Sequence, residues 1–233
     1  MIRETIVKLN NELPATVKLV AVSKFHPFEA IEEAYRAGQR FFGESRPQEL
    51  QAKVKRLEEI RAERGDPEYM SDIEWHFIGH LQTNKLKMVL PYVSLVQSVD
   101  SVRLLEAIDR WGAANGKLIN VLLECHIAAE ESKQGFSEVE LTELLSSDVN
   151  YANVRICGLM GMATFTDDET LIRSDFQRLL DLQQVLHDWI GESVNVPAGC
   201  NELSMGMSDD YPTAIAMGST IVRIGSMIFG ERN

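Results

Sequence analysis

The sequence predicts one (β/α)8 barrel with an additional helix before it, over about residues 2–12. Short apolar runs alternate with helical patterns along the whole chain, eight of these runs have the character of strands, and no abrupt change of composition divides the chain. The 233 residues are close to the ~250 that such a barrel uses. We therefore expect a single domain spanning residues 1–233.

Several of the expected strands are nearly continuous in valine, isoleucine and leucine, which is typical of parallel strands buried on both faces. They span residues 18–23, 40–43, 74–78, 95–98, 118–124, 155–160, 202–205 and 221–224. An open, doubly wound sheet would also alternate strands with helices. Its dinucleotide-binding form needs a GxGxxG motif after the first strand, and this chain has none there.

The expected helices have recognisable ends. Pro27 suits the first residue of a helix that Gly38 can end, because proline fixes φ and glycine accepts the left-handed conformation. Asp100 can cap a helix over residues 101–114. The segment that begins at Ser137 has the pattern of a capping box, with glutamate three residues later.

Composition excludes several classes of function. The net charge is −12, from 35 acidic and 23 basic residues, so we expect no nucleic-acid partner, because a polyphosphate backbone would be repelled. No apolar run reaches the ~18 residues of a membrane span, and the first residues lack the apolar core of a signal peptide. The three cysteines have no CxxC spacing, which argues against a disulfide framework and a structural zinc site. We expect a cytoplasmic protein.

Lys24 directly follows the first expected strand. In such barrels the reactive groups gather at the C-terminal ends of the strands. A lysine that leaves a buried strand can lose solvation, which lowers its pKa and makes its amine a nucleophile. Lys24 is therefore a candidate nucleophile, and a solvated lysine at a strand end is the alternative.

Two loops near the end of the chain could bind a phosphate group. One contains Ser204 and Gly206 and follows the seventh expected strand, and the other contains Gly225 and Ser226 and follows the eighth. Barrels often bind phosphate at these two loops. Glycines permit close approach of the backbone, hydroxyls donate hydrogen bonds, and a helix beginning near Asp209 would add backbone amides. The alternative is that these residues only form tight turns.

Arg223 lies inside the last apolar strand, where a charge needs a partner or a ligand. An ion pair with a neighbouring strand would satisfy it. Combined with Lys24 and the two loops, however, Arg223 fits pyridoxal 5′-phosphate: the lysine takes the aldehyde, the loops take the phosphate, and the arginine meets the pyridine nitrogen. Because a guanidinium cannot accept a proton, the nitrogen would stay unprotonated and the cofactor would be a weakened electron sink.

At these residues the sequence resembles the pyridoxal phosphate homeostasis protein family, which is related to the barrel domain of alanine racemases. The matching motifs cover nearly the whole chain. They are AVSK ending at Lys24, FGE ending at Glu44, HFIGHLQTNK from His76, GLM ending at Met160, LSMGMS from Leu203 and GSTIVRIG ending at Gly225. The resemblance implies a barrel of the alanine-racemase type and a role in vitamin B6 homeostasis.

The resemblance also implies roles for individual residues. Lys24 would carry the cofactor as a Schiff base, and Arg223 would face the pyridine nitrogen. The remaining cofactor-binding residues would be Ser204, Gly206, Gly225 and Ser226 around the phosphate, and Met160 and His80 in the wall of the pocket.

Two positions depart from the usual family pattern. The family commonly has asparagine where this chain has Ser45, and threonine is frequent where it has Ser226. Serine at position 45 is shorter and lacks the amide donor, so water or Arg46 would meet whatever the asparagine contacts. Serine at position 226 keeps the hydroxyl. Neither change affects Lys24, and the cofactor assignment stands.

The resemblance implies that racemases of this fold take an acid/base tyrosine from a second, β-rich domain. Eight strands and their helices already use the 233 residues of this chain, so we expect no second domain and no catalytic residue. His76 and His80 straddle a strand end without an evident third ligand, so we expect no metal site. The expected protein is a monomer that holds pyridoxal 5′-phosphate, with apo-enzymes that require it as candidate partners. The alternatives are a weak pyridoxal-phosphate-dependent racemase and a cofactor-free aldolase that uses Lys24.

Overall fold

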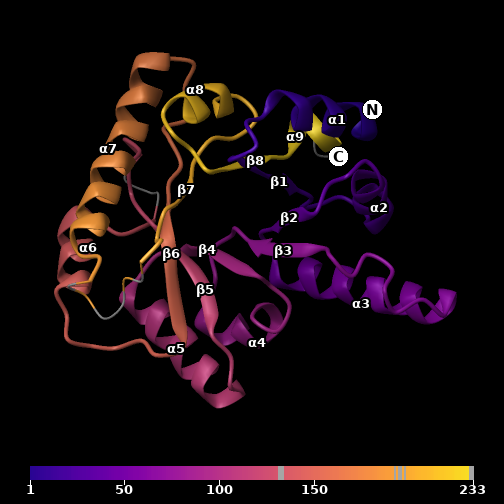
Figure 1. The fold of residues 1–233 in the computed structure, drawn as a ribbon, viewed down its shortest axis with the longest axis horizontal. Helices are drawn as coiled ribbons and strands as arrows, with labels where there is room; N and C mark the ends of the chain where they lie inside the picture. Colours follow the sequence, from indigo (N-terminus) through magenta and orange to yellow (C-terminus); the bar gives the residue numbers. More distant parts are fainter. Residues whose placement is uncertain (131–133, 192, 194–195, 197, 231–233) are drawn as a thin grey trace.

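The computed structural model describes residues 1–130, 134–191, 193, 196 and 198–230. Its eight parallel strands pair in chain order, and the last pairs with the first, so they close a barrel (Figure 1). The strands are β1 (Lys18–Val22), β2 (Phe41–Glu44), β3 (Glu74–Phe77), β4 (Leu95–Val99), β5 (Ile119–Glu124), β6 (Val154–Met160), β7 (Glu202–Ser204) and β8 (Ile221–Ile224). The predicted fold is confirmed, and each expected strand boundary lies within one residue of the observed one.

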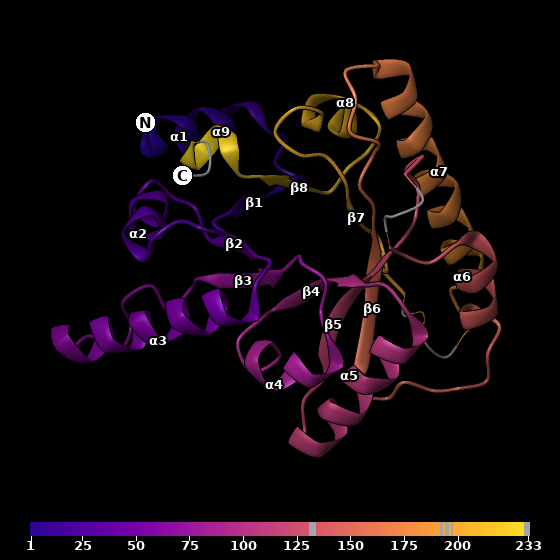
Figure 2. The same cartoon turned by 180° about the vertical axis from the view of Figure 1, so that it is seen from behind.

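Helices surround the strands in both views of the ribbon (Figures 1 and 2). They are α1 (Ile2–Glu12), α2 (Phe28–Arg36), α3 (Pro47–Arg64), the short 3-10 helix η1 (Thr83–Lys85), α4 (Leu86–Val89), α5 (Val102–Asn115), α6 (Glu138–Leu145), α7 (Glu169–Asp188), α8 (Tyr211–Ala216) and α9 (Ser226–Phe229). The expected helix over residues 2–12 is α1. It lies beside α9, so the two ends of the described chain meet on one side of the barrel (Figure 1).

Two of the expected helix starts are wrong by one residue. Pro27 is the N-cap of α2 and not its first residue, because its ψ of 165° is extended. Ser101, not Asp100, caps α5: its side chain accepts a backbone N–H of the first turn, whereas Asp100 pairs with His80. The capping box at Ser137 is confirmed.

Apolar side chains form one cluster inside the barrel and a larger one between the strands and the helices. The inner cluster consists of Val20, Leu95, Leu122, Met160 and Ile221. Because side chains alternate along a strand, Leu122 points inward while its neighbour Leu123 joins the outer cluster. The same alternation directs Glu124, the last residue of β5, toward the barrel axis.

The inner wall changes its register in β6, beside Gly158. The pairing of β5 with β6 shifts between Val121 and Leu122. Gly158 has a φ of +150°, and a Cβ atom there would lie 1.8 Å from the backbone oxygen of Glu202. Only glycine allows β7 to approach this closely, and the shift leaves Met160 facing the interior.

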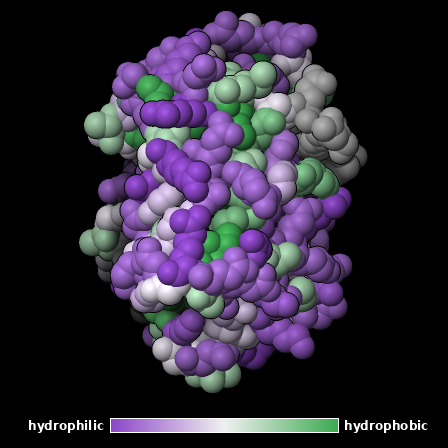
Figure 3. Space-filling model, turned by 90° about the vertical axis from the view of Figure 1, so that its right-hand side faces the viewer, coloured by the Kyte–Doolittle hydropathy of each residue, from purple (hydrophilic) through white to green (hydrophobic). Residues whose placement is uncertain are grey.

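The face shown in Figure 3 is mostly hydrophilic, and its apolar side chains form small, separate areas. None of the helices in the described part of the chain is both long and apolar enough to cross a membrane.

Candidate functional site

A cavity of about 350 Å³ opens at the C-terminal ends of the strands. It is built mainly from the residues that follow β1, β6, β7 and β8. The lining residues are Val22, Lys24, His26, Ile78, Met162, Phe165, Met207, Ser208, Asp209, Arg223, Gly225, Ser226 and Gly230. The four predicted site residues Lys24, Arg223, Gly225 and Ser226 therefore lie around one cavity.

Lys24 occupies a tight turn directly after β1. The turn begins at Ser23, whose N–H donates to the Gly43 oxygen over 3.1 Å, and it closes with a 3.1 Å bond from the His26 N–H to the Ser23 oxygen. Ser23 is fully buried and Lys24 is half-buried. The lysine side chain is thus held at the boundary between the barrel interior and the cavity.

Arg223 is buried beneath the cavity and bonded to neighbouring strands. Its Nη1 donates to Ser204 Oγ over 2.5 Å, and its Nη2 donates to the Gly161 oxygen over 3.1 Å. Burial lowers its pKa to about 10, with Glu124 and Asp210 opposing the shift, so it remains a cation at neutral pH. Among the described residues no carboxylate accepts a hydrogen bond from Arg223, and the arginine presents a buried positive charge to the cavity.

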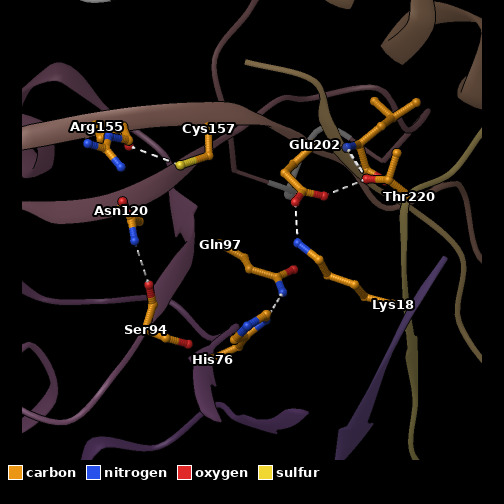
Figure 4. A network of polar contacts seen from close by, with 10 residues as sticks. Lys18, His76, Ser94, Gln97, Asn120, Arg155, Cys157, Glu202 and Thr220 are labelled. Atoms are coloured by element: carbon orange, nitrogen blue, oxygen red, sulfur yellow. Dashed lines mark hydrogen bonds and ion pairs between the residues drawn. The ribbon is translucent and has the colours of Figure 1, made fainter. Parts of the chain in front are cut away.

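The hydrogen bonds of Arg223 continue across the barrel. Ser204 donates its hydroxyl to Gln97 Oε1 over 2.7 Å. Gln97 Nε2 in turn lies 2.8 Å from His76 Nδ1, the contact drawn in Figure 4. Burial, then the charge of Lys18, lowers the pKa of His76 to about 3, so its ring is neutral. We assign the imidazole proton to Nε2, since Nδ1 must accept from the amide. The resulting chain of donors runs in one direction from Arg223 to His76.

Glu124 is a buried acid whose pKa lies near neutral pH. It is 7% exposed and stands opposite Met160 in the β5–β6 register. Burial, then the charge of Asp100, raises its pKa to about 7, against the lowering effect of Arg223 and His80. A group with this pKa exchanges its proton within the physiological range.

The loops after β7 and β8 meet at two hydroxyl groups. Ser226 Oγ donates to Ser208 Oγ over 3.1 Å. Gly206 has a φ of +96°, and a Cβ atom there would lie 2.6 Å from the Cβ of Ala214, so the loop can pack closely only with glycine. The helix expected near Asp209 begins two residues later, at Tyr211, because Met207 and Asp210 first close a turn.

Several predicted site residues are not among those that line the cavity. Ser204 is buried under Arg223, Gly206 forms the turn above it, and Met160 belongs to the inner apolar cluster. Ser45 packs against Gly79: a Cβ atom at position 79 would lie 2.2 Å from the backbone oxygen of Ser45. The cofactor contacts expected of these residues stay predictions.

His80 lies in a second hollow of about 510 Å³ over β3 and β4. Its Nδ1 is 2.9 Å from Asp100 Oδ2, and Arg103 lines the same hollow. Its expected contact with the cofactor also stays a prediction. In the described ranges no three histidine, cysteine, aspartate or glutamate side chains come together as metal ligands.

The sequence reasoning missed some residues that the geometry places at the site. His26 and Asp209 line the cavity but were not predicted to line it, and Ser208 was predicted only as part of the loop after the seventh strand. Glu124 could have been found from alternation, since it follows the inward-facing Leu122 by two residues at a strand end.

The family model "Alanine racemase, N-terminal domain" matches residues 1–233. The pyridoxal phosphate homeostasis protein of Haemophilus influenzae is 37% identical over 230 residues, which cover 99% of this chain and 91% of that protein. The structure of PipY from Synechococcus elongatus with PLP bound is 33% identical, has a TM-score of 0.81, and is matched over 99% of this chain and 100% of that one. Alanine racemase from Corynebacterium glutamicum, at 14% identity and a TM-score of 0.69 over 60% of its chain, shares the fold. The chain therefore belongs to the pyridoxal phosphate homeostasis proteins, within the family of alanine racemase N-terminal domains.

Proposed function

We propose that this protein binds pyridoxal 5′-phosphate as a Schiff base on Lys24 and holds it for vitamin B6 homeostasis without catalysing a reaction on it. The observation that carries the proposal is the cavity at the barrel mouth, which unites Lys24, Arg223 and Ser226. The names of the relatives and the PLP bound to PipY support it. The proposal includes a cytoplasmic monomer whose partners are apo-enzymes that require the cofactor.

The residues of the cavity fit this group. The cavity volume of about 350 Å³ lies in the ~300–1,000 Å³ range of small-molecule sites. Lys24 offers an amine for the aldehyde, Ser208 and Ser226 offer hydroxyls for the phosphate, and Arg223 offers guanidinium N–H groups for the ring nitrogen. When bound, pyridoxal phosphate supplies an electron sink conjugated with the imine.

Each residue then has a separate task. Lys24 Nζ would hold the cofactor through its aldehyde carbon, with release of one water. Ser208 and Ser226 orient the phosphate oxygens. Arg223 donates a hydrogen bond to the ring nitrogen and keeps it unprotonated, since a guanidinium retains its protons at neutral pH. Its bonds to Ser204 and Gly161 keep the guanidinium plane fixed.

The lining of the cavity supports holding over catalysis. Racemisation needs a base within about 3 Å of the Cα proton on the correct face. No tyrosine is among the described residues that line the cavity. His26 lines it, and its ring is held by stacking on Phe229, with centroids 5.1 Å apart.

The first test is the absorption spectrum of the protein with added pyridoxal phosphate, before and after borohydride reduction. We expect a new band, trapped by reduction as a covalent adduct that peptide mass spectrometry locates at Lys24. Lys24→Ala should abolish the adduct. Lys18→Ala, at the other end of the same strand, is the matched control and should keep it. An unchanged band in Lys24→Ala would overturn the assignment.

Solvent deuterium exchange at Cα of alanine and other amino acids tests the absence of catalysis. We expect no exchange above that of free pyridoxal phosphate. Fast exchange that disappears in Lys24→Ala would replace the holding role by a racemase-like one.

A further inference from the structure

The turn that carries Lys24 has an unusual backbone. Phe25, the next residue, has a φ of +68°, and among the described residues only Met70 shares such a conformation without being glycine. A bulky side chain disfavours this region, so surrounding contacts must hold Phe25 there. Such strain next to a reactive side chain calls for an account of what maintains it.

The first turn of α3 holds Phe25. Its N–H donates to Glu49 Oε2 over 2.7 Å. The guanidinium of Arg46 stacks over the phenyl ring, 4.2 Å from its centre, and its Nη1 lies 3.4 Å from Glu49 Oε1. The residue on the C-terminal side of Lys24 is therefore fixed by a carboxylate and a cation from one short segment.

A buried ion pair holds Ser23, on the other side of Lys24. Lys53 Nζ donates to the Ser23 oxygen over 2.8 Å and to Glu44 Oε1 over 2.5 Å. Ser23 donates its hydroxyl to the same carboxylate oxygen over 2.6 Å. Lys53 stands one helical turn after Glu49, with Nζ 4.0 Å from Glu49 Oε2. One cluster therefore contacts both neighbours of Lys24. It consists of Glu44, Glu49 and Lys53, and we call it the α3 clamp.

The α3 clamp is a costly way to stabilise a fold. The Lys53 and Glu44 side chains are 8% and 0% exposed, and well-packed apolar residues often stabilise as much as a buried ion pair. Glu44 Oε2 is buried without a hydrogen-bond partner, and burial raises the pKa of this carboxyl. A buried polar atom left unpaired requires an explanation, and stability does not provide one.

We propose that Glu44, Glu49 and Lys53 are positioning residues for Lys24. By fixing Ser23 and the left-handed Phe25, they direct the amine into the cavity and order the lysine before the cofactor arrives. The inference rests on the proposed function. The clamp affects formation of the covalent bond and not binding of the ring or phosphate, since none of its three residues lines the cavity.

Two ligands separate positioning from general structural support. Pyridoxal 5′-phosphate can bond covalently to Lys24, whereas pyridoxamine 5′-phosphate has an amine in place of the aldehyde and can bind only through its ring and phosphate. A positioning role slows capture of the first ligand and leaves affinity for the second unchanged. Structural damage weakens both.

The test compares Glu49→Ala, Lys53→Met and the control Lys55→Met. Lys55 is exposed on the same helix, where it pairs with Glu59. We expect Glu49→Ala and Lys53→Met to slow borohydride-trappable adduct formation about tenfold or more, with the pyridoxamine phosphate Kd within about twofold of wild type. Glu49→Gln keeps an acceptor for the Phe25 N–H and should restore most of the rate. Glu49, at 24% side-chain exposure, gives a foldable variant if Lys53→Met unfolds.

Three outcomes would overturn parts of this account, and they differ. If Glu49→Ala and Lys53→Met form the adduct at the wild-type rate, only the positioning role of the α3 clamp is overturned. Parallel loss of both ligands assigns the cluster to structure and also overturns it. A wild-type protein that forms no adduct overturns the proposed function, and the inference falls with it.

Discussion

The two ends of the barrel interior use similar residues in different ways. Lys18 is the first residue of β1, and Lys24 follows the end of the same strand, six residues later. Lys18 lies near Glu202 of β7, and Lys24 lies near Arg223 of β8, the strand that pairs with β1. At the N-terminal end, Lys18 pairs directly with Glu202, whose other oxygen accepts the Thr220 hydroxyl over 2.8 Å (Figure 4). At the C-terminal end, Lys24 shares a cavity with the cation Arg223.

The difference separates the end of the barrel that is arranged for binding from the end whose charges stabilise the fold. Charges at the N-terminal end neutralise each other in direct contacts. At the mouth, burial shifts the pKa values of Glu124 and Arg223 because no direct ion pair between them offsets it. Groups held in such an environment cost stability and are typical of functional sites. The comparison therefore predicts that neutralising the mouth stabilises the fold, while neutralising the other end weakens it.

Glu124→Gln tests this with the largest expected effect. The folded-state pKa of Glu124 is about 7, above its ordinary value of 4.5, so the wild type loses stability as pH rises through this window. Glutamine carries no charge at any pH. We expect the variant to match the wild type near pH 4 and to be more stable by up to about 3 kcal/mol at pH 8. Urea unfolding across this pH range measures the difference.

Asp100, Arg223 and His80 also face Glu124, and their own titration could alter the profile. The control is Glu140→Gln in the capping box of α6, where bonding to Ser137 lowers the pKa. That variant should lose stability at neutral pH. A Glu124→Gln protein that is less stable at pH 8 would show that Glu124 is a paired group like Glu202, and the contrast between the two ends would fail.

Arg223→Leu removes the buried cation at the mouth. The Ser204 hydroxyl and the Gly161 oxygen lose their donor, and the ring nitrogen of the cofactor loses its partner. We expect the pyridoxal phosphate Kd to rise at least about tenfold, equal to ~1.4 kcal/mol, with a shifted absorption band. Spectroscopic titration measures both changes.

Arg155→Leu provides the control for that titration. Arg155 is exposed on β6, toward the other end of the barrel, and should leave affinity and spectrum unchanged. If Arg223→Leu binds normally and the protein turns over a carbonyl substrate without cofactor, the aldolase alternative replaces the proposed function, because an aldolase has no use for an arginine at a ring nitrogen.

The sequence allowed the fold to be predicted closely, and the site only in part. Alternating apolar runs and helix ends depend on local spacing, so every strand was found. Lys24 and Arg223 were found because strand ends and charges within apolar strands are visible in one dimension. The donor chain through Gln97 to His76 and the grip of Lys53 on Ser23 were not, because they join strands and helices whose contacts depend on how the barrel closes.

The smallest effect is expected at the N-terminal end of the barrel strands, which is the other half of the comparison. Glu202→Gln removes one charge of the pair with Lys18 but keeps an oxygen that can accept the Thr220 hydroxyl. The two side chains are 43% and 27% exposed, so solvent screens much of their attraction, and we expect a loss of about 0.5–1 kcal/mol in urea unfolding.

The same variant should bind pyridoxal phosphate with wild-type affinity, because the inner apolar cluster around Val20 and Leu122 separates Glu202 from the cavity. A double-mutant cycle with Lys18→Met isolates the pairwise energy from other effects of each substitution. A loss of cofactor affinity without a loss of stability would mean that charge at this end reaches the mouth through Lys18, His76 and Gln97. The two ends would then act as one electrostatic unit, and the separation of a binding end from a stabilising end would be wrong.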